Sequence, residues 1–308
     1  MSKPRRPKRP IDGILLLDKP AGITSNKALQ EIKHLMQAEK AGHTGSLDPL
    51  ATGLLPICLG EASKFSQYLL DADKVYRATM RLGQKTTTAD AEGEIIAERP
   101  VPVLSCDDIE AVLAQFRGAI TQVPSMFSAL KKDGRPLYEL ARQGVEVERA
   151  ARPVHIYRLE LLAAEADSWE IEVACSKGTY VRNLVEDMGE AIGCGAHVTA
   201  LRRLAAGPFQ EHQMVSLDTV KAMVAAAGPG GADSLLEAPW AGLVGLPHIE
   251  LSETASYYLL QGQPVRVPSA PTEGLVLAFE AGGRFLGLTE VADDGRLAPK
   301  RLIRGDQA

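Results

Sequence analysis

The chain has 308 residues, of which 45% are apolar and 24% are charged, and its formal net charge is −5. A chain of this length and composition can bury a full core, and we expect one large domain followed by a small one. The negative net charge argues against a protein that coats nucleic acid indiscriminately, and no run approaches the roughly 18 apolar residues of a membrane span. The sequence therefore predicts a soluble, cytoplasmic protein.

The first ten residues are basic and rich in proline, with five positive charges and no negative ones. They lack the apolar segment of a signal peptide, and we expect residues 1–10 to form a flexible tail. The cysteines are widely spaced, and no histidine stands at the spacing of a zinc ligand, which is typical of reduced thiols. They are Cys58, Cys106, Cys175 and Cys194. We therefore predict no metal site.

Apolar residues recur at helical spacing in three segments of the first two hundred residues. The first segment follows Ser25, which we interpret as the N-cap of a helix. The second follows Ser105, which forms the pattern of a capping box with Asp108. The third begins at Val181 and is closed by Gly193, a residue typical of helix ends.

Strands are predicted from alternation and from β-branched residues. Trp169, Ile171 and Val173 alternate with polar residues, which indicates a sheet with one wet face. Residues 76–83 and 154–162 are predicted strands as well. Because strands and helices do not alternate regularly, we predict an α+β fold with a mixed, largely antiparallel sheet flanked by helices.

The C-terminal part differs from the rest. Residues 228–232, with the sequence GPGGA, indicate a linker or a long loop. Beyond them, short β-like runs alternate with segments rich in Gly, Pro and Asp; these runs are 265–267, 275–279 and 284–288. We place a main domain at 11–245 and a small β-rich domain at 246–308. The small domain resembles a PUA-like RNA-binding module, and the alternative is a β appendage that only packs against the main domain.

Residues 42–49, with the sequence GHTGSLDP, carry one carboxylate on a segment built to turn sharply. Gly42 and Gly45 supply backbone freedom, and Pro49 disfavours the helical conformation at Asp48. A lone carboxylate is neither a glycosidase pair nor a metal cage. Asp48 is therefore either a turn residue or a nucleophile.

Several segments in the same order resemble the TruB family of tRNA pseudouridine synthases. Besides GHTGSLDP they are LLDKP at 16–20, LATGLLP at 50–56, QVPSMFSALK at 122–131 and GTYVR at 178–182. The resemblance extends from about residue 11 to residue 209. It implies that the chain converts the T-loop uridine at tRNA position 55 into pseudouridine. The reaction has no redox step, so we expect no cofactor, and we expect a monomer whose partner is the T arm of tRNA.

The resemblance also implies roles for five residues. Asp48 is the implied nucleophile, which adds to C1′ of the ribose or removes a proton from C2′, and Arg182 is its buried partner. Tyr76 is implied to stack on the flipped base and to take the C5 proton, while Tyr180 and Leu201 wall the pocket. The alternative for Arg182 is a surface or phosphate-binding arginine, the alternative for Tyr76 is a core or cross-strand residue, and the alternative for Leu201 is a core residue.

Further residues are candidates for RNA contacts. His43 could stack into the gap that an extruded uridine leaves, or it is an ordinary turn histidine. Lys64, Lys131, Lys132 and Arg135 are candidates for the RNA backbone, and the last three lie in a loop that contains glycine. The alternative for each of the four is a solvated surface charge.

Two rival functions stay open. A nucleoside hydrolase could also use an aspartate, but a glycosidase has a second carboxylic acid near the anomeric carbon, and the sequence shows none beside Asp48. A non-catalytic tRNA-binding chaperone would need a basic surface and the C-terminal module but not Asp48.

Overall fold

Strands β4 (Lys74–Leu82) and β12 (Ala196–Ala206) form the centre of an 11-stranded sheet in the computed structural model, which describes residues 8–128 and 130–303. The main path of this sheet runs β14–β1–β3–β12–β4–β11–β10–β7. Along it, β1 is parallel to β14 and β3 is parallel to β12, whereas the other pairs are antiparallel. The predicted α+β fold with a mixed, largely antiparallel sheet is confirmed.

The other strands of this sheet are β1 (Gly13–Lys19), β2 (Ala41–His43), β3 (Thr52–Leu59), β7 (Gly118–Gln122), β10 (Arg152–Ala164), β11 (Ser168–Cys175), β13 (Phe209–Gln210), β14 (Val215–Ser216) and β15 (Leu236–Glu237). Two short hairpins lie outside it, namely β5 (Gln84–Thr86) with β6 (Ile95–Glu98), and β8 (Lys131–Lys132) with β9 (Arg135–Pro136). The strands predicted at 76–83 and 154–162 are confirmed as β4 and β10, and β10 is longer at both ends.

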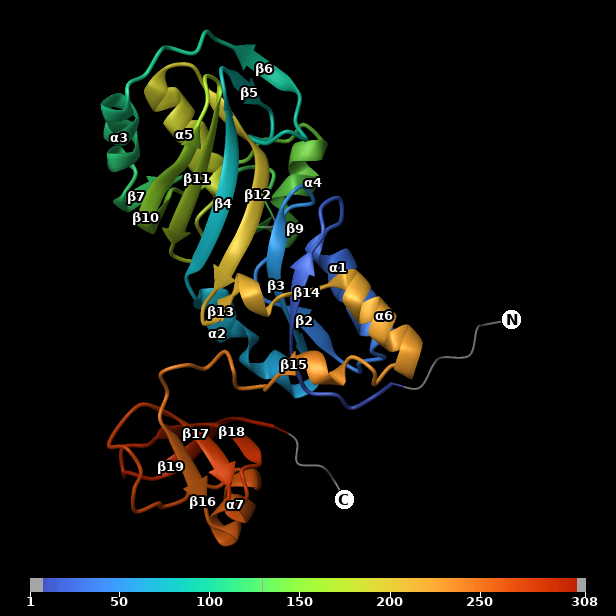
Figure 1. Cartoon of the computed structure of the whole chain (residues 1–308). Coiled ribbons are helices and arrows are strands. Elements are labelled where there is room, and N and C mark those ends of the chain that lie inside the picture. Colours follow the sequence, from blue (N-terminus) through green and yellow to red (C-terminus); the bar gives the residue numbers. More distant parts are fainter. Residues whose placement is uncertain (1–7, 129, 304–308) are drawn as a thin grey trace.

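The helices of the main domain are α1 (Ser25–Leu35), α2 (Ser66–Asp71), α3 (Cys106–Gln115), α4 (Leu137–Arg142), α5 (Val181–Ile192) and α6 (Leu217–Ala227), with 3-10 turns η1 (Gly60–Phe65), η2 (Glu211–Gln213) and η3 (Asp233–Leu235). Apolar side chains of α1, α3, α5 and α6 join those of the strands in one core, so these helices cover one face of the sheet (Figure 1). A second, smaller core forms where η1 and α2 cover β1 and β3 on the opposite face.

The helix ends confirm two predictions and correct one. Ser105 and Asp108 form a complete capping box at the start of α3, and Gly193 ends α5 in the left-handed conformation. The N-cap of α1, however, is Thr24 and not Ser25. The hydroxyl of Ser25 is buried and bonds to another segment, as described below, so it is not free to cap its own helix.

The open face of the sheet carries paired charges. Within β11 every second residue is buried, which confirms the predicted sheet with one wet face. On the opposite side of this strand Glu172 pairs with Arg158 at 2.7 Å and with Arg77 at 3.3 Å. Arginine and glutamate therefore alternate across neighbouring strands, which keeps this surface polar.

The C-terminal domain is built from a four-stranded sheet of β16 (His248–Leu251), β17 (Leu275–Glu280), β18 (Phe285–Val291) and β19 (Leu297–Leu302), with helix α7 (Glu253–Leu260). Figure 1 shows it as a separate small body beside the main domain. The predicted runs at 275–279 and 284–288 correspond to β17 and β18, and the run at 265–267 contributes one isolated bridge from Val265 to Leu297. A β-rich C-terminal domain is thus confirmed, although the sequence did not predict α7.

The two domains meet through aromatic side chains. The segment at 228–232 is a loop after α6, because the chain then returns to the main sheet through β15, which pairs with β1. Beyond β15 the ring of Trp240 lies 4.8 Å from that of Phe285, and the ring of Phe65 lies 5.6 Å from that of Phe285. This apolar contact fixes the small domain against η1.

The N-terminal segment departs from one expectation. Residues 1–7 lie outside the described part of the chain, but Arg9 belongs to it and is held in place. Its backbone N–H donates to the carbonyl of Gln37 at 2.8 Å, and its guanidinium pairs with Asp233. The flexible tail predicted over 1–10 therefore does not include Arg9, because two separate elements hold that residue.

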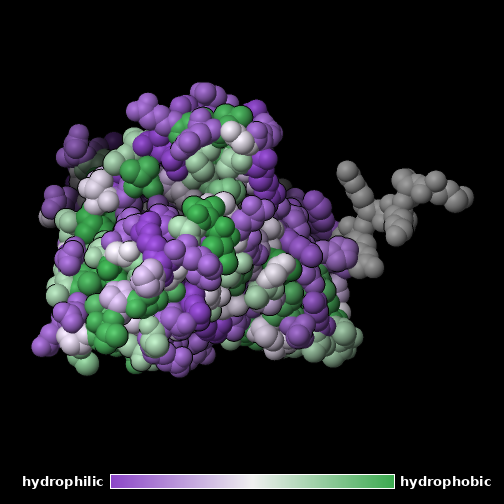
Figure 2. Space-filling model, turned by 90° about the horizontal axis from the view of Figure 1, so that it is seen from above, coloured by the Kyte–Doolittle hydropathy of each residue, from purple (hydrophilic) through white to green (hydrophobic). Residues whose placement is uncertain are grey.

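In Figure 2, hydrophilic and hydrophobic residues are intermingled on the face seen from above. None of the helices in residues 8–128 and 130–303 combines the length and the apolar composition needed to cross a bilayer.

Candidate active site

Asp48 lies on the loop that joins the antiparallel strands β2 and β3, and other parts of the chain hold this loop on both sides of it. The hydroxyl of Ser25 accepts a hydrogen bond from the N–H of Leu47 at 2.7 Å and donates one to its carbonyl at 3.0 Å. The ammonium of Lys19, a residue with no exposed surface, donates to the carbonyl of Pro49 at 3.4 Å. The backbone next to the carboxylate is therefore fixed.

Arg182 comes from the first turn of α5 and is 5% exposed. Its Nε lies 3.0 Å from Oδ2 of Asp48, and its Nη1 lies 3.0 Å from Oδ2 of Asp90. Nη1 also donates to the carbonyl of Thr88, and Nη2 donates to the carbonyl of Phe127 at 2.9 Å. All three nitrogens thus have partners, and the structure brings the two residues of the predicted pair into contact.

Asp90 is a residue of this site that sequence reasoning missed. It is 2% exposed, and its Oδ1 accepts hydrogen bonds from the hydroxyl of Thr88 at 2.6 Å and from the N–H of Glu92 at 3.0 Å. The surrounding sequence, TTTADAEG, indicates a polar turn and does not single out this carboxylate. Asp90 belongs to the site because it pairs with Arg182, which lies on a helix distant in sequence, so no local pattern could identify it.

The two carboxylates that contact Arg182 differ in exposure. The side chain of Asp48 is 40% exposed, whereas that of Asp90 is 3% exposed. Burial of its carboxyl group raises the pKa of Asp48 above its ordinary value of 3.8; Arg182 opposes this rise, and the charge of Asp90 adds to it. Oδ1 of Asp48 has no hydrogen-bond partner among the described residues. That oxygen can therefore reach a substrate.

Two further predicted residues, Tyr76 and Tyr180, lie near Asp48, and a third, Leu201, lies on the strand that pairs with that of Tyr76. Tyr76 lies half-buried on β4, and Leu201, which is 8% exposed, lies on the neighbouring strand β12. Tyr180 precedes α5 and exchanges two backbone hydrogen bonds with the side chain of Gln122, at 2.9 and 3.2 Å. Burial raises the pKa of both tyrosines, and the nearby charge of Asp48 raises both further. The structure thus brings both predicted tyrosines near one carboxylate, with Leu201 on the neighbouring strand.

His43 ends β2, five residues before Asp48. Its Nδ1 is buried without a hydrogen-bond partner among the described residues. Burial lowers the pKa of this imidazole, and the positive charge of Arg203 lowers it further, so the ring is neutral at pH 7. A neutral, incompletely satisfied ring is suited to stacking against a base, and this role stays a prediction.

Three of the candidate backbone contacts share one hairpin. Lys131 and Lys132 form β8, Arg135 opens β9, and all three are exposed. Asp133 and Gly134 join the strands with positive φ angles of 51° and 81°. This tight turn presents the three cations together on the hairpin and away from the core.

Lys64 has a different environment. It lies in η1, pairs with Glu61 at 2.5 Å and donates to the carbonyl of Leu302 at 2.6 Å. It therefore joins the main domain to β19 of the C-terminal domain. The structure does not bring Lys64 together with the hairpin cations, and its contact with RNA stays a prediction.

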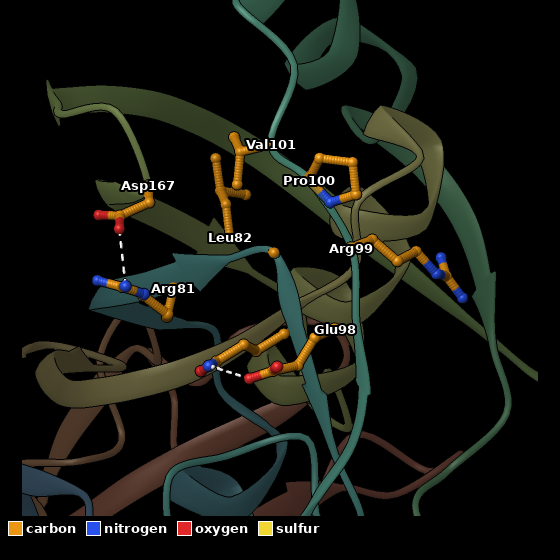
Figure 3. A pocket seen from close by; sticks show the side chains of 9 residues that line it. Arg81, Leu82, Glu98, Arg99, Pro100, Val101 and Asp167 are labelled. Atoms are coloured by element: carbon orange, nitrogen blue, oxygen red, sulfur yellow. Dashed lines mark hydrogen bonds and ion pairs between the residues drawn. The ribbon is translucent and has the colours of Figure 1, made fainter.

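A pocket of about 390 Å³ lies at the opposite end of β4, about 20 Å along the strand from Tyr76 (Figure 3). Its charged side chains are already paired: Arg81 with Asp167 at 2.7 Å, Arg99 with Glu190 at 2.8 Å, and Glu98 with Gln84 at 2.8 Å. Such a pocket offers few groups to a ligand. Among the described residues, no cluster of three or more His, Cys, Asp or Glu side chains is arranged to hold a metal ion.

Comparison with known protein families gives three matches along the chain. The model described as TruB family pseudouridylate synthase (N terminal domain) matches residues 33–181. The model described as tRNA pseudouridylate synthase B C-terminal domain matches residues 182–238, and the one described as Pseudouridine synthase II TruB, C-terminal, matches residues 247–303.

Individual relatives agree with the family models. A tRNA pseudouridine synthase B of Pseudomonas aeruginosa is 58% identical over 304 residues, which cover 99% of this chain and 100% of that protein. A protein of the same name from Stutzerimonas stutzeri is 57% identical over 306 residues, with the same coverage. A solved structure, described as a Cbf5-Nop10-Gar1 complex, contains a chain with a TM-score of 0.72 and 27% identity, which covers 94% of this chain and 84% of that one.

The protein is a pseudouridine synthase. Two observations define this class: the mixed sheet carries an aspartate that pairs with a buried arginine, and the chain is similar to the family models and structures above. Within that class the chain belongs to the TruB family. It is thus an isomerase that acts on tRNA, and the resemblance found in the sequence is confirmed.

Proposed function

We propose that the enzyme converts the uridine at position 55, in the T loop of tRNA, into pseudouridine. The observation that carries this proposal is the partly exposed carboxylate of Asp48, whose Oδ2 lies 3.0 Å from Nε of Arg182. The buried carboxylate of Asp90 pairs with Nη1 of the same arginine. We further propose that the enzyme acts as a monomer on the T arm, in the cytoplasm. The rest of the site supports the proposal, because moving uracil from N1 to C5 requires an oriented anion and a closed pocket.

Asp48 begins the reaction on the sugar of the extruded nucleotide. Its Oδ1 either adds to C1′, so that the N1–C1′ bond breaks and its electron pair leaves with uracil, or removes a proton from C2′ to give a glycal. Both routes need the aspartate as an anion, and the adjacent guanidinium of Arg182 favours that form. Both leave a detached uracil that must turn to present C5.

The aromatic and apolar side chains then keep the base in place. Tyr76 stacks on the flipped base and takes the C5 proton after the new bond has formed. Tyr180 and Leu201 wall the pocket and exclude water, which would otherwise release the base by hydrolysis. The reaction rearranges one nucleotide without oxidation or reduction, so it requires no cofactor.

Other residues bind the RNA. His43 fills the gap left by the extruded uridine, and Lys64, Lys131, Lys132 and Arg135 contact the backbone. Residues 11–245 form the catalytic domain, and residues 246–308 form a PUA-like domain that binds RNA. The exposed hairpin supports the assignment of its three cations, since a cationic surface of this kind is what phosphates attract.

The test is mass spectrometry of a T-arm RNA treated with wild type and with Asp48→Asn, followed by chemical derivatisation that reveals pseudouridine. We expect wild type to isomerise one uridine without a change of mass and Asp48→Asn to isomerise none, with RNA binding retained. An RNA with cytidine at position 55 is the matched control, and it should stay unmodified.

Two outcomes would replace the proposal with a rival function. Release of free uracil would indicate a nucleoside hydrolase. Tight binding without any modification would indicate a tRNA-binding chaperone. Isomerisation at a different uridine would keep the enzyme class and overturn the assignment of the site.

A further inference from the structure

Arg203 is a buried cation that the reaction scheme above does not use. It lies on β12 and is 1% exposed. Its Nε donates to the carbonyl of Leu54 at 2.6 Å, and its Nη2 donates to the carbonyl of Gly45 at 3.1 Å. No carboxylate of the described residues forms an ion pair with it, whereas the equally buried Arg182 has two such partners. A buried charge without a counter-charge is costly, which suggests a use beyond packing.

The position of Arg203 is directly opposite Tyr76. The two residues are register partners across the antiparallel pair of β4 and β12, so their side chains share one face of the sheet. Burial raises the pKa of Tyr76, and both the charge of Arg203 and a hydrogen bond from it act in the opposite direction. The neighbouring Arg202 is the register partner of Arg77 on the other face and is paired with Asp18 at 2.9 Å.

Two glycines allow the neighbouring backbone to approach Arg203 closely. A Cβ atom on Gly53, which has a φ of 97°, would lie 2.3 Å from the carbonyl oxygen of Arg203. A Cβ atom on Gly45, with a φ of 84°, would lie 3.4 Å from its Nη1. The two glycines therefore let β3 and the Asp48 loop approach this arginine closely. The same guanidinium thus contacts the loop of the nucleophile and faces the tyrosine.

We propose that Arg203 is a positioning residue that holds the hydroxyl of Tyr76 and stabilises the negative charge on its oxygen in the step that removes the C5 proton. This inference rests on the proposed function and adds a residue to it. In the step, the C5–H bond breaks and its electron pair forms the C5–C6 double bond. The π pair of N1–C6 moves to N1, which takes a proton from water, while the C5 proton passes to the Tyr76 oxygen and later returns to solvent.

The other charges around the pair do not replace Arg203. The charge of Asp48 raises the pKa of Tyr76, and a thiolate at Cys175 would raise it too, but burial raises the pKa of that thiol to about 11. Lys19, Lys74 and His43 lie near the guanidinium, and burial lowers the pKa of each lysine to about 8. These lysines lose their charge in mildly alkaline solution, whereas a guanidinium keeps its charge. Arg203 is therefore the cation that remains opposite Tyr76 when a phenolate forms.

The first test compares single-turnover rates of variants on T-arm RNA near neutral pH, well below the pKa of Tyr76, which burial raises. For Arg203→Gln we expect a loss of about 100-fold or more, the scale of general base catalysis. The loss should stay constant between about pH 7 and about pH 9, because Tyr76 is a phenol in both proteins over this range. Arg203→Lys, which keeps the charge, should lose less than Arg203→Gln. Arg77→Gln removes an exposed arginine beside Tyr76 and should follow wild type.

A second readout does not depend on Arg203→Gln being folded. An RNA with 5-fluorouridine at the target has no C5 proton, so the base can detach and reattach through C5 without the tyrosine step. We expect Arg203→Lys to be slower than wild type on uridine RNA and equal to wild type in forming the C–C-linked product from the fluorinated RNA, measured by mass spectrometry. Equal losses on both RNAs would mean that Arg203 supports the fold alone and would overturn the inference.

Tyr76→Phe separates failure of this inference from failure of the proposed function. If Tyr76→Phe loses turnover on uridine RNA but Arg203→Gln turns over uridine RNA at the wild-type rate, or loses as much on the fluorinated RNA as on uridine RNA, the inference fails and the proposed function stands. If Tyr76→Phe isomerises uridine at the wild-type rate, the assigned role of Tyr76 fails, and the role of Arg203 fails with it.

Discussion

Arg182 and Asp90 form a buried ion pair in which Nη1 and Oδ2 lie 3.0 Å apart and the two side chains are 6% and 3% exposed. The same guanidinium meets Asp48, whose side chain is 40% exposed, through its Nε. Arg182 therefore has one carboxylate partner inside the protein and one that faces the substrate. The two contacts should respond differently to substitution, because breaking a buried pair leaves a charge without compensation.

We expect Asp90→Ala to lower the free energy of unfolding by about 3 to 5 kcal/mol and to slow turnover, because Arg182 loses its buried partner. Asp48→Asn should abolish turnover and leave the free energy of unfolding unchanged or slightly raised, since burial already disfavours the charge of this carboxylate. Denaturant unfolding and single-turnover assays of both variants measure these effects. A large loss of stability in Asp48→Asn would show that the exposed contact also supports the fold.

The raised pKa of Asp48 predicts a pH dependence of definite sign. The folded state binds the carboxyl proton more tightly than the unfolded state, so this group adds stability at low pH that is lost as the pH rises from about 3.8 through the raised value. Over the same window activity should appear, because the reaction needs the anion. The difference in the free energy of unfolding, Asp48→Asn minus wild type, should therefore increase as the pH rises and become constant near neutrality.

Sequence patterns with local causes predicted much of the fold. The capping box of Ser105 and Asp108 and the glycine at 193 act within one helix turn, and the alternation in β11 reflects burial on one face of a strand. The resemblance to a family supplied Asp48 and Arg182, which the structure brings into contact. These features depend on neighbours in sequence or on whole motifs, so reading the chain in order is sufficient to find them.

Features that depend on distant contacts were not predicted. Asp90 pairs with Arg182, which lies on a helix much later in the chain. Arg203 differs from the adjacent Arg202 only in the face of β12 on which its side chain lies. Ser25 was assigned to its own helix because its bonds to Leu47 are invisible in the sequence. In each case the local pattern fits two environments, and tertiary packing selects one.

The pair Ser25 and Thr24 tests how the loop positions the nucleophile. Ser25→Ala removes the hydroxyl that bonds both backbone groups of Leu47, so we expect a loss of about 1 to 3 kcal/mol in stability and a lower kcat with KM nearly unchanged. Thr24→Ala removes the N-cap of α1 and should cost about 1 kcal/mol while kcat stays at the wild-type value. Equal effects of both variants on kcat would mean that the loop does not depend on Ser25.

Salt dependence tests the cations of the β8–β9 hairpin. Replacing Lys131, Lys132 and Arg135 with glutamine should weaken binding of T-arm RNA and reduce the slope of log K against log salt by about 2 to 3, since each contact with a duplex phosphate contributes about 0.9. Arg99→Gln, at the opposite end of β4 from Tyr76 and already paired with Glu190, is the control and should keep the wild-type slope. A slope that the hairpin variant leaves unchanged would exclude these phosphate contacts.

Lys64 allows a sharper distinction because it has partners inside the protein. Its bonds to Glu61 and to the carbonyl of Leu302 join the two domains, so Lys64→Gln should lower the free energy of unfolding as well as the affinity for RNA. The hairpin variant should lower affinity alone, because its three cations are exposed. If Lys64→Gln changes stability without any change in the salt slope, Lys64 serves the domain junction and not the RNA backbone.

His43 should act before the chemistry, by filling the space that the extruded uridine leaves. Because its imidazole is neutral and its Nδ1 has no partner among the described residues, a plain aromatic ring should replace it well. We expect His43→Ala to slow turnover on a folded T arm, by up to the roughly 1 to 3 kcal/mol of one stacking contact, and His43→Phe to recover most of the rate. On a short single-stranded RNA, which has no stack to restore, the two variants should differ little from wild type. Complete loss of isomerisation in His43→Ala on both RNAs would instead assign this residue to the chemical step.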